Sequence, residues 1–336
     1  MKYKVSIIMP VFNVEKYIKN ALDSVINQTM NFSDIQVIIV NDASTDSSSR
    51  ILEAYEKFEN FHIIHLKNNS GSAAKPRNIA LKHVDAEYVM FLDPDDEYSE
   101  DYCEIMYSTI KKYDASMVKC NFTDVNDEGI INKRPNFNKN IDKIIINSND
   151  EPLNTVSVCN GIHNYDFIIQ NEIYFPEKCF GEDIFFSVEE HLFMDKLIFL
   201  NNYFGYIYNN RKVSHAKSPS VDNILNILKV FYLTRELCEK HSREDIIEIV
   251  LGTQIMGLYF RIRNVDRWFN KYSILKEVSF FLKTSPKLIV PNKLYRISNS
   301  LLERNLIYLT IFYFTLINIF SNSKILQKLI VKLNID

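Results

Sequence analysis

Short apolar runs and segments with helical spacing alternate along residues 4–92 of the chain. Runs of apolar and β-branched residues predict strands at residues 4–9, 36–40, 61–66 and 87–92. Apolar residues that recur every three or four positions predict helices at residues 14–26, 51–58 and 73–83. This alternation is typical of a mostly parallel sheet that is covered by helices on both faces.

A polar loop follows each predicted strand. Because the carboxyl ends of parallel strands meet at one edge of the sheet, these loops lie where ligands bind in such folds. The polar residues of interest in them are Asn13, Glu15, Asp42, Ser44, Asp46, Arg77, Asn78, Asp93 and Asp95. We therefore expect the functional site at this edge.

The strongest chemical signal is the acidic run Asp93-Pro94-Asp95-Asp96-Glu97, which follows the last of these strands. Carboxylates this close repel one another unless a cation or solvent lies among them. The chain has seven glycines and carries neither G-x-G-x-x-G nor G-x-x-x-x-G-K-[ST], the loops that bind phosphates through their backbone. One explanation is a carboxylate pair that binds Mg²⁺ or Mn²⁺, which in turn holds a diphosphate. The other is an ordinary acidic turn in solvent.

Composition narrows the class of protein. With 336 residues and 46% hydrophobic content, the chain can form an α/β core and a smaller second unit. A net charge of −3 argues against a nucleic-acid partner, because phosphate binding depends on clustered Lys and Arg. The five cysteines form no C-x-x-C pair, which favours a reducing, cytoplasmic location. The N-terminal segment MKYKVSIIMPVFN is interpreted as a strand and not as a signal peptide.

An ordered set of motifs resembles the inverting glycosyltransferases of family 2. The motifs are VSIIMPVFNVEKYI, IIVNDASTD, SGSAAKPRN, FLDPDDEY and FGEDIFF, and the match covers about the first 215 residues. The resemblance implies an α/β GT-A fold, with a mixed, mostly parallel sheet, flanking helices and a C-terminal helical region. It implies a catalytic domain at residues 1–217, made of a nucleotide-binding half (1–98) and an acceptor-binding half (99–217), followed by helices at 218–336.

The same resemblance implies roles for individual residues. Asp42 would hydrogen-bond the uracil of a UDP-sugar, and Arg77 would help to hold the nucleotide. Asp93 and Asp95 would form the D-x-D motif that carries Mn²⁺ or Mg²⁺, with Asp95 as the direct ligand. The implied nucleotide-sugar contacts are Pro10, Phe12, Asn13, Glu15, Asp42, Arg77, Asp93 and Asp95. Arg211 and His215 would contact the diphosphate, His215 being a candidate further metal ligand, although a solvated connecting loop explains that stretch equally well.

Asp183 would be the general base that takes the proton from the acceptor hydroxyl, with Glu182 in support. This division of labour is sensible, because a metal offsets the charge of the leaving diphosphate while the acceptor must lose a proton on the opposite face of the sugar. The structural alternative is that Asp183 is a helix N-cap. In the same way Asp46 is counted as a cap of the second helix and not as a site residue, and the alternative for Arg77 is a pair with a surface carboxylate.

The chain departs from the family pattern at two places. Ala43 stands where many members carry Gly, and the acceptor-side stretch SVCNGIHNYDF is divergent. Neither change falls on the proposed metal ligands or base, but both leave the donor sugar and the acceptor undetermined.

Helical spacing dominates from Ile224 onward. Within it, NVDRW (264–268) differs only at its first residue from the Q-x-x-R-W motif of processive polysaccharide synthases. Those enzymes carry long transmembrane helices that this sequence lacks, so a core tryptophan at Trp268 is the simpler interpretation.

The last segment predicts contact with a membrane surface. LIYLTIFYFTLINIF (306–320) is uncharged but shorter than the ~20 residues of a spanning helix. Lys324, Lys328 and Lys332 then recur every fourth residue beside apolar positions. From Lys283 onward the chain has eight Lys or Arg and only two acidic residues. This positive charge predicts that a tail at 306–333 binds the anionic cytoplasmic leaflet of a membrane. The alternative is a core helix or an oligomer contact, and the sequence does not indicate an oligomeric state.

Together these observations predict a metal-dependent, inverting hexosyl- or N-acetylhexosaminyltransferase of cell-envelope polysaccharide biosynthesis. It would transfer sugar from a UDP-sugar to a glycan or lipid-linked acceptor, without nucleic acid, as a cytoplasmic or peripheral membrane protein. A processive polysaccharide synthase and a non-catalytic nucleotide-sugar-binding module are the alternatives. A sugar nucleotidyltransferase would need a Gly-rich loop where this chain has PVFNVEKY.

Overall fold

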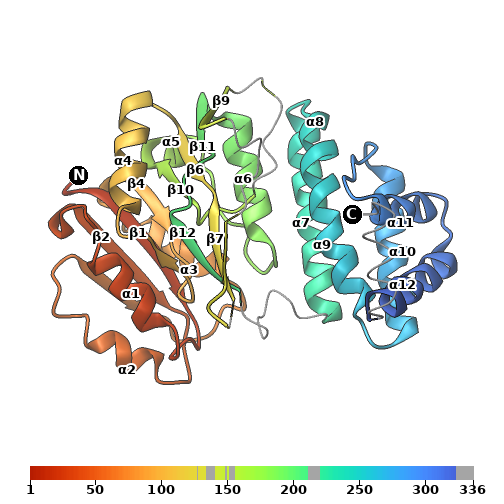
Figure 1. Ribbon diagram of the computed structural model, residues 1–336, viewed down its shortest axis with the longest axis horizontal. Helices are drawn as coiled ribbons and strands as arrows, with labels where there is room; N and C mark the ends of the chain where they lie inside the picture. Colours follow the sequence, from red (N-terminus) through yellow and green to blue (C-terminus); the bar gives the residue numbers. More distant parts are fainter. Residues whose placement is uncertain (127, 134–140, 148–149, 151–155, 211–219, 323–336) are drawn as a thin grey trace. The chain divides into compact units, whose positions relative to one another are not determined.

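The computed structural model describes residues 1–126, 128–133, 141–147, 150, 156–210 and 220–322 (Figure 1). These residues form two compact units. The sheet unit contains the described residues up to 150, together with 157–178 and 189–210. The helical unit contains residues 156, 179–188 and 220–322.

The sheet unit is built on a mixed sheet with the strand order β3-β2-β1-β4-β10-β6-β11-β9. The strands are β1 (Tyr3–Val11), β2 (Ile35–Asn41), β3 (Phe61–His65), β4 (Ala86–Phe91), β6 (Met117–Cys120), β9 (Lys143–Asn147), β10 (Gly161–Asn164) and β11 (Lys196–Leu200). Strands β1 to β4 pair in parallel, as does β6 with β11, whereas β10 runs antiparallel to both β4 and β6, and β9 to β11. The strands predicted within residues 4–92 are confirmed, each to within two residues at either end.

Helices flank this sheet (Figure 1). They are α1 (Ile18–Ile26), α2 (Ser48–Glu53), α3 (Ala74–Leu81), α4 (Tyr102–Tyr113) and α5 (Tyr165–Gln170), with a 3₁₀ turn at Phe32–Asp34. Every residue of β2 is buried, as expected for a parallel strand that is covered on both faces. The side of α1 that carries Ile18, Ala21, Leu22 and Val25 is buried as well, so the apolar spacing read from the sequence marks the core.

A smaller sheet lies beside the acidic run. It has the order β5-β12-β7-β8, formed by β5 (Glu97–Tyr98), β12 (Tyr206–Asn210), β7 (Phe122–Asn126) and β8 (Ile131–Lys133). Tyr206 of β12 pairs with Tyr98 of β5, directly after the acidic residues. This pairing brings a segment from much later in the chain onto the carboxyl end of β4.

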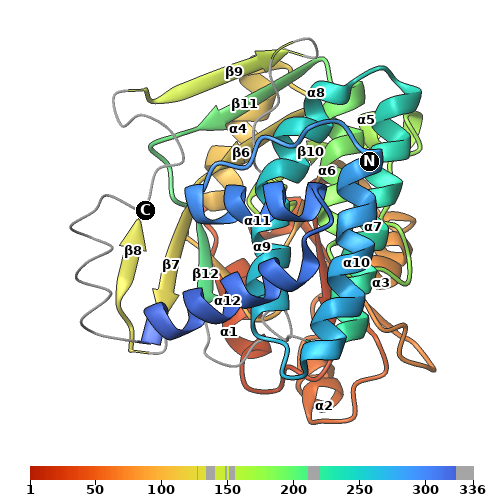
Figure 2. The same ribbon diagram turned by 90° about the vertical axis from the view of Figure 1, so that its right-hand side faces the viewer.

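The helical unit contains α7 (Val221–Lys240), α8 (Glu244–Ile246), η3 (Ile247–Leu251), α9 (Gly252–Arg263), α10 (Trp268–Thr284), α11 (Lys293–Glu303) and α12 (Ile307–Asn322) (Figure 2). Helix α6 (Glu182–Phe193) has residues in both units. Leu258, Tyr259, Phe281 and Phe314 are fully buried in the core of the helical unit. None of the helices in the described residues is long and apolar enough to cross a membrane.

One expectation for this unit changes. The side chain of Trp268 is 63% exposed, so the core position expected for it is wrong. The buried residues of α10 begin at Ile274, and Trp268 lies on the first turn, which extends beyond that core. Helix α12 buries Phe314 and Ile317 but exposes other apolar residues, namely Tyr308, Leu309 and Phe312. Lys324, Lys328 and Lys332 of the predicted tail lie outside the described residues.

Candidate functional site

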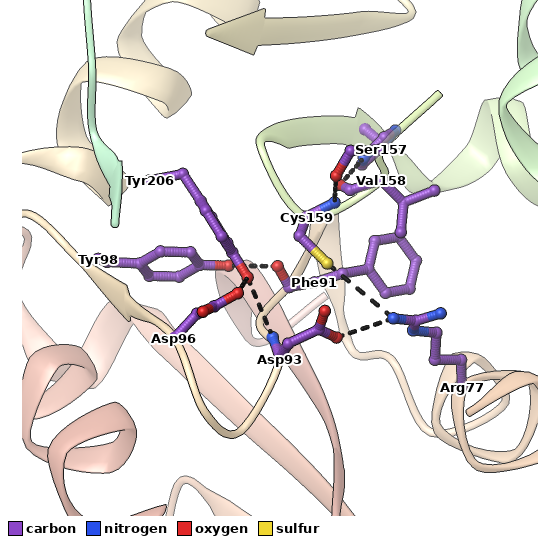
Figure 3. A network of polar contacts seen from close by, with 10 residues as sticks. Arg77, Phe91, Asp93, Asp96, Tyr98, Ser157, Val158, Cys159 and Tyr206 are labelled. Atoms are coloured by element: carbon purple, nitrogen blue, oxygen red, sulfur yellow. Dashed lines mark hydrogen bonds and ion pairs between the residues drawn. The ribbon is translucent and has the colours of Figure 1, made fainter. Parts of the chain in front are cut away.

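Arg77 and Asp93 form an ion pair at the carboxyl end of β4 (Figure 3). Nη2 of Arg77 donates to Oδ1 of Asp93 at 2.8 Å. The guanidinium also lies over the ring of Phe175, 5.2 Å from its centroid. Arg77 thus pairs with a carboxylate, as its structural alternative expected, but its own side chain is only 3% exposed. The Asp93 side chain is 36% exposed and lines a cavity.

Asp96 is the buried member of the acidic run. Its carboxylate accepts hydrogen bonds from the Tyr206 hydroxyl at 2.8 Å and from the backbone N–H of Asn209 at 2.9 Å. Burial, and then the nearby charge of Asp93, raise the pKa of Asp96 to about 8. The Arg77 cation therefore offsets part of the repulsion within the run, and the raised pKa of Asp96 favours its protonated form. We did not single out Asp96 from the sequence, because only its burial separates it from its acidic neighbours.

Asp95 and Asp93 are the candidate metal ligands. The backbone carbonyl of Asp95 accepts from Nδ2 of Asn209 at 2.9 Å, and its side chain is half-buried. Within the described part of the chain, no group of three or more His, Cys, Asp or Glu side chains is arranged to hold a metal ion. A pair of carboxylates is nevertheless a suitable donor set for Mg²⁺ or Mn²⁺ when substrate phosphates and water complete the shell. The two residues fit an ion that arrives with a diphosphate.

A cavity of about 300 Å³ opens beside the ion pair. Its lining combines carboxylates with aromatic rings and two small polar side chains: Asp93, Asp96, Phe122, Asp124, Ser157, Cys159, Tyr206 and Tyr208. Carboxylates accept hydrogen bonds from hydroxyl groups, and aromatic faces pack against C–H surfaces. The cavity therefore suits a small, hydroxyl-rich ligand. Apart from Asp93, we expected none of these lining residues from the sequence.

Asp42 lies at the carboxyl end of β2, on the same edge as Asp93, and is buried. Both of its carboxylate oxygens accept from the backbone N–H of Ser70, and Oδ2 also accepts from the Ser70 hydroxyl at 2.8 Å and from Nδ2 of Asn69 at 3.2 Å. Fewer of these bonds reach Oδ1. A ligand group that binds Asp42 therefore finds more acceptor capacity on that oxygen.

Asn13 and Glu15 connect two loops of the site. Oδ1 of Asn13 accepts from the backbone N–H of Thr45 at 2.8 Å, and Oε2 of Glu15 accepts from that of Ser47 at 2.9 Å. Asp46 accepts from the N–H of Glu15 and from that of Ser48, the first residue of α2, so it does contact the start of that helix. These contacts hold the β1–α1 and β2–α2 loops together.

Three further positions clarify the nucleotide-side loops. Ala43 has a φ of +58°, a left-handed conformation that glycine adopts without strain, and this is consistent with the Gly that the family resemblance led us to expect at this position. Pro10 is buried within β1, whereas Phe12, just after the strand, is exposed. Of these two expected contacts, only Phe12 is exposed to solvent.

Glu182 and Asp183 lie in the first turn of α6, within the helical unit. The helix begins at Glu182, so Asp183 is its second residue and the N-cap interpretation is wrong. Glu182 is buried, and Asp183 is half-buried. Arg211 and His215, the candidate diphosphate contacts, lie outside the described residues.

Comparison with known proteins assigns part of the chain to a family. The family model described as "Glycosyl transferase family 2" matches residues 6–170. Those residues belong to glycosyl transferase family 2. Along the family 2 segment lie Asp42, Arg77, Asp93 and Asp95, whereas Glu182 and Asp183 follow it.

Individual relatives extend the likeness beyond the family 2 segment. The poly(ribitol-phosphate) β-N-acetylglucosaminyltransferase TarS of Staphylococcus aureus (strain MW2) is 26% identical over 279 residues, which is 80% of this chain and 48% of TarS. The chain thus spans about half the length of that relative. The crystal structure of S. aureus TarS 1–349 with UDP-GlcNAc superposes with a TM-score of 0.71 at 22% identity, covering 92% of this chain and 89% of that one.

A more distant structure has the same architecture. The mannosyltransferase PcManGT of Pyrobaculum calidifontis, solved with GDP-Man and Mn²⁺, has a TM-score of 0.56 at 13% identity and covers 96% of this chain and 89% of that one. These superpositions, with the mixed sheet described above, show the GT-A fold. The fold class expected from the sequence is confirmed, including its C-terminal helices.

Proposed function

We propose that this chain is an inverting glycosyltransferase that moves a sugar from a UDP-sugar to a hydroxyl group of a glycan or lipid-linked acceptor. The observation that carries the proposal is the Arg77–Asp93 pair, next to Asp95 and a hydroxyl-compatible cavity, on the sheet edge that also carries Asp42. Family membership and the TarS likeness support a nucleotide-sugar donor. TarS, as named, transfers N-acetylglucosamine, so a hexosyl or N-acetylhexosaminyl donor is the first choice.

Divalent metal is part of the proposal. Asp95, with Asp93 beside it, would hold Mn²⁺ or Mg²⁺, which supplies positive charge for the diphosphate leaving group. Arg77 neutralises one charge of the acidic run and so lowers the repulsion that a dianionic ligand meets on entry. The Mn²⁺ bound by PcManGT, a distant structural relative, supports the choice of ion.

Asp183 is proposed as the general base, with Glu182 beside it. The Asp183 carboxylate takes the proton from the acceptor hydroxyl while that oxygen forms the new bond to the anomeric carbon. The bond from the same carbon to the diphosphate breaks on the opposite face, which inverts the configuration.

The test is a screen of UDP-sugars in which UDP release is measured with and without cell-envelope glycan acceptors. Release that depends on both donor and acceptor supports the proposal. If UDP binds but no donor is turned over, the chain is a binding module. Long polymer made from one donor would instead indicate a processive synthase.

We also propose that the helical unit contacts the cytoplasmic surface of an anionic membrane. Trp268 and Phe269 on α10, and Tyr308 and Phe312 on α12, are exposed aromatic residues. Tyr272 joins the two sets, because its ring lies 5.1 Å from that of Tyr308. Exposed cations on α10 and just before it, Lys276 and Arg267, would meet anionic headgroups while the rings enter the interface.

Sedimentation with anionic and neutral vesicles tests this contact. The double variant Trp268→Ser, Phe312→Ser should lose binding to anionic vesicles. Ile169→Ser, which changes an exposed apolar residue of the sheet unit, should keep it. An intact protein that ignores anionic vesicles would refute the contact and favour a protein partner for this surface.

A further inference from the structure

Three successive carbonyl groups in residues 157–159 accept hydrogen bonds from buried side chains. Nζ of Lys119 donates to the carbonyl of Ser157 at 3.2 Å, Nε2 of His163 to that of Val158 at 3.1 Å, and the hydroxyl of Tyr102 to that of Cys159 at 3.2 Å. Two residues of this segment, Ser157 and Cys159, line the cavity beside Asp93 (Figure 3). Segment 157–159, which forms one wall of the cavity, is therefore held by a side-chain hydrogen bond to the backbone carbonyl of each of its residues.

Two of the donors are themselves held by Glu190 of α6. Oε1 of Glu190 bonds Nδ1 of His163, and Oε2 lies 3.9 Å from Nζ of Lys119. The carbonyl of Val158 can only accept, so Nε2 of His163 carries the hydrogen of that bond. Lys119, His163 and Glu190, which we call the brace, are each at most 2% exposed.

A glycine makes room for the brace. Gly161 lies opposite Lys119 in the β10–β6 pair, and His163 is two residues further along β10, on the same face. A Cβ at Gly161 would stand 3.1 Å from Nε2 of His163 and 3.3 Å from Cγ of Lys119. The strand pairing therefore brings Lys119 and His163 together beside Gly161, where the absence of a side chain leaves room for them.

The wall also reaches the ion pair. Nη2 of Arg77, which donates to Asp93, lies 4.0 Å from Sγ of Cys159. A shift of the wall would change the cavity and this contact together. Burying charged groups costs free energy, and well-packed apolar residues of similar volume are often as stable or more so. Stability alone thus gives weak reason for a charged brace at this place.

We propose that Lys119, His163 and Glu190 are positioning residues that fix segment 157–159 and thereby determine which sugar the cavity accepts. This inference rests on the proposed function only in taking the ligand to be the sugar of a nucleotide-sugar. The brace residues do not contact the reacting atoms of the substrate. It acts through the backbone of the wall, as the three carbonyl contacts require.

The experiment compares dissociation constants for UDP and for a panel of UDP-sugars, measured by calorimetry with Mn²⁺, in wild type and two variants. Lys119→Met keeps the length of the side chain but removes the donor. Gly161→Ala keeps the three brace side chains but adds a Cβ that would crowd His163, Lys119 and the backbone carbonyl of Val118. The control is Lys111→Met, which removes an exposed lysine that pairs with Glu87.

In both brace variants the affinity for UDP should fall less than the affinity for the preferred UDP-sugar, because Asp42, the proposed uracil contact, lies on another loop. The extra affinity for the preferred UDP-sugar should fall, and kcat/KM should drop by on the order of 10²-fold, the cost of a misplaced binding wall. The difference in affinity between the preferred UDP-sugar and the other UDP-sugars should become smaller. A rise in KM for acceptor with donor affinity unchanged would overturn the inference, because it would place the acceptor sugar, and not the donor sugar, in the cavity.

Folded brace variants that keep wild-type sugar preference and kcat/KM would overturn the inference. Equal losses of UDP and UDP-sugar affinity would also overturn it, since they indicate general disorder of the site. If wild type binds UDP-sugars but never turns them over, the transferase proposal fails and the binding comparison still tests the brace. If wild type binds no UDP-sugar, both proposals are wrong.

Discussion

The Arg77 guanidinium and the Asp93 carboxylate, 2.8 Å apart, join helix α3 to the end of strand β4. Arg77 is almost fully buried, whereas Asp93 faces a cavity. The effect of breaking the pair therefore depends on which of the two residues is changed. Removing the carboxylate charge leaves a buried cation with a weaker partner. Removing the cation leaves a carboxylate that solvent can reach.

Asp93→Asn should therefore lower the free energy of unfolding by about 2 kcal/mol in metal-free buffer, the usual value of a hydrogen bond to a charged group. Urea denaturation measures it. The matched control is Asp34→Asn, which breaks the Lys4–Asp34 pair of the same 2.8 Å length on the surface. That change should cost well under about 1 kcal/mol, because solvent screens exposed pairs. Equal losses would contradict the buried role of Arg77.

Metal removal should abolish transfer. With EDTA in excess, UDP release should stop, and Mn²⁺ or Mg²⁺ should restore it, because the leaving diphosphate loses its counter-charge. Asp95→Asn should weaken metal-dependent UDP binding in calorimetry without changing metal-independent binding. Full activity in chelator would refute the assignment of both carboxylates.

Asp183→Asn should reduce kcat by on the order of 10²–10⁴-fold while UDP affinity survives, because the amide keeps the shape but cannot take a proton. The control is Asp166→Asn, which changes an acidic residue in the first turn of another helix, α5. That variant should keep its activity. If Asp183 only stabilises its helix, the two variants will instead behave alike, each losing about 1 kcal/mol of stability or less.

Ala43→Gly should raise the free energy of unfolding by about 0.5–1 kcal/mol, because it removes the strain of a left-handed alanine at φ +58°. Ala54→Gly is the control with the opposite sign. Ala54 ends α2 at φ −67°, where glycine only adds freedom to the unfolded chain. Thermal and urea unfolding would show the contrast, and destabilisation by both changes would contradict the strain.

Stability should depend on pH through Glu189. Burial, with a smaller contribution from the charge of Glu190, raises the pKa of Glu189 to about 8, although the N–H of Tyr174 partly offsets this. The folded state therefore binds more protons than the unfolded state from about pH 4.3 to about pH 8. Within this window Glu189 makes stability fall as pH rises, by up to about 1.4 kcal/mol per pH unit, and above it this contribution is constant.

Glu189→Gln should make that slope shallower when urea denaturation is repeated between pH 5 and pH 9. The amide oxygen can still accept from the Tyr174 N–H, so the packing of the site is preserved. Glu53→Gln, at an exposed position of α2, should leave the slope as it is in wild type. An unchanged slope in Glu189→Gln would show that this carboxyl titrates as an ordinary one.

Local pattern determined much of this protein. The apolar runs that form β1 to β4, the helical spacing of α1, and the placement of Asp42 and Asp93 directly after strands β2 and β4 can all be read from short windows of the sequence. All of the family motifs except FGEDIFF lie on or directly beside these segments. The site edge could therefore be predicted, and its fold class with it.

Contacts between distant segments decided the rest. The bond from Tyr206 to Asp96 spans 110 residues, and it exists only because β12 pairs with β5. The brace likewise needs β6, β10 and α6 to meet, and the exposure of Trp268 depends on where the core of α10 begins. Burial and pKa follow from such neighbours, because desolvation and nearby charge are properties of the packed structure. No short stretch of sequence contains these neighbours. Only the tertiary structure could therefore show that the pKa of Asp96 is raised and that buried side chains hold segment 157–159 in place.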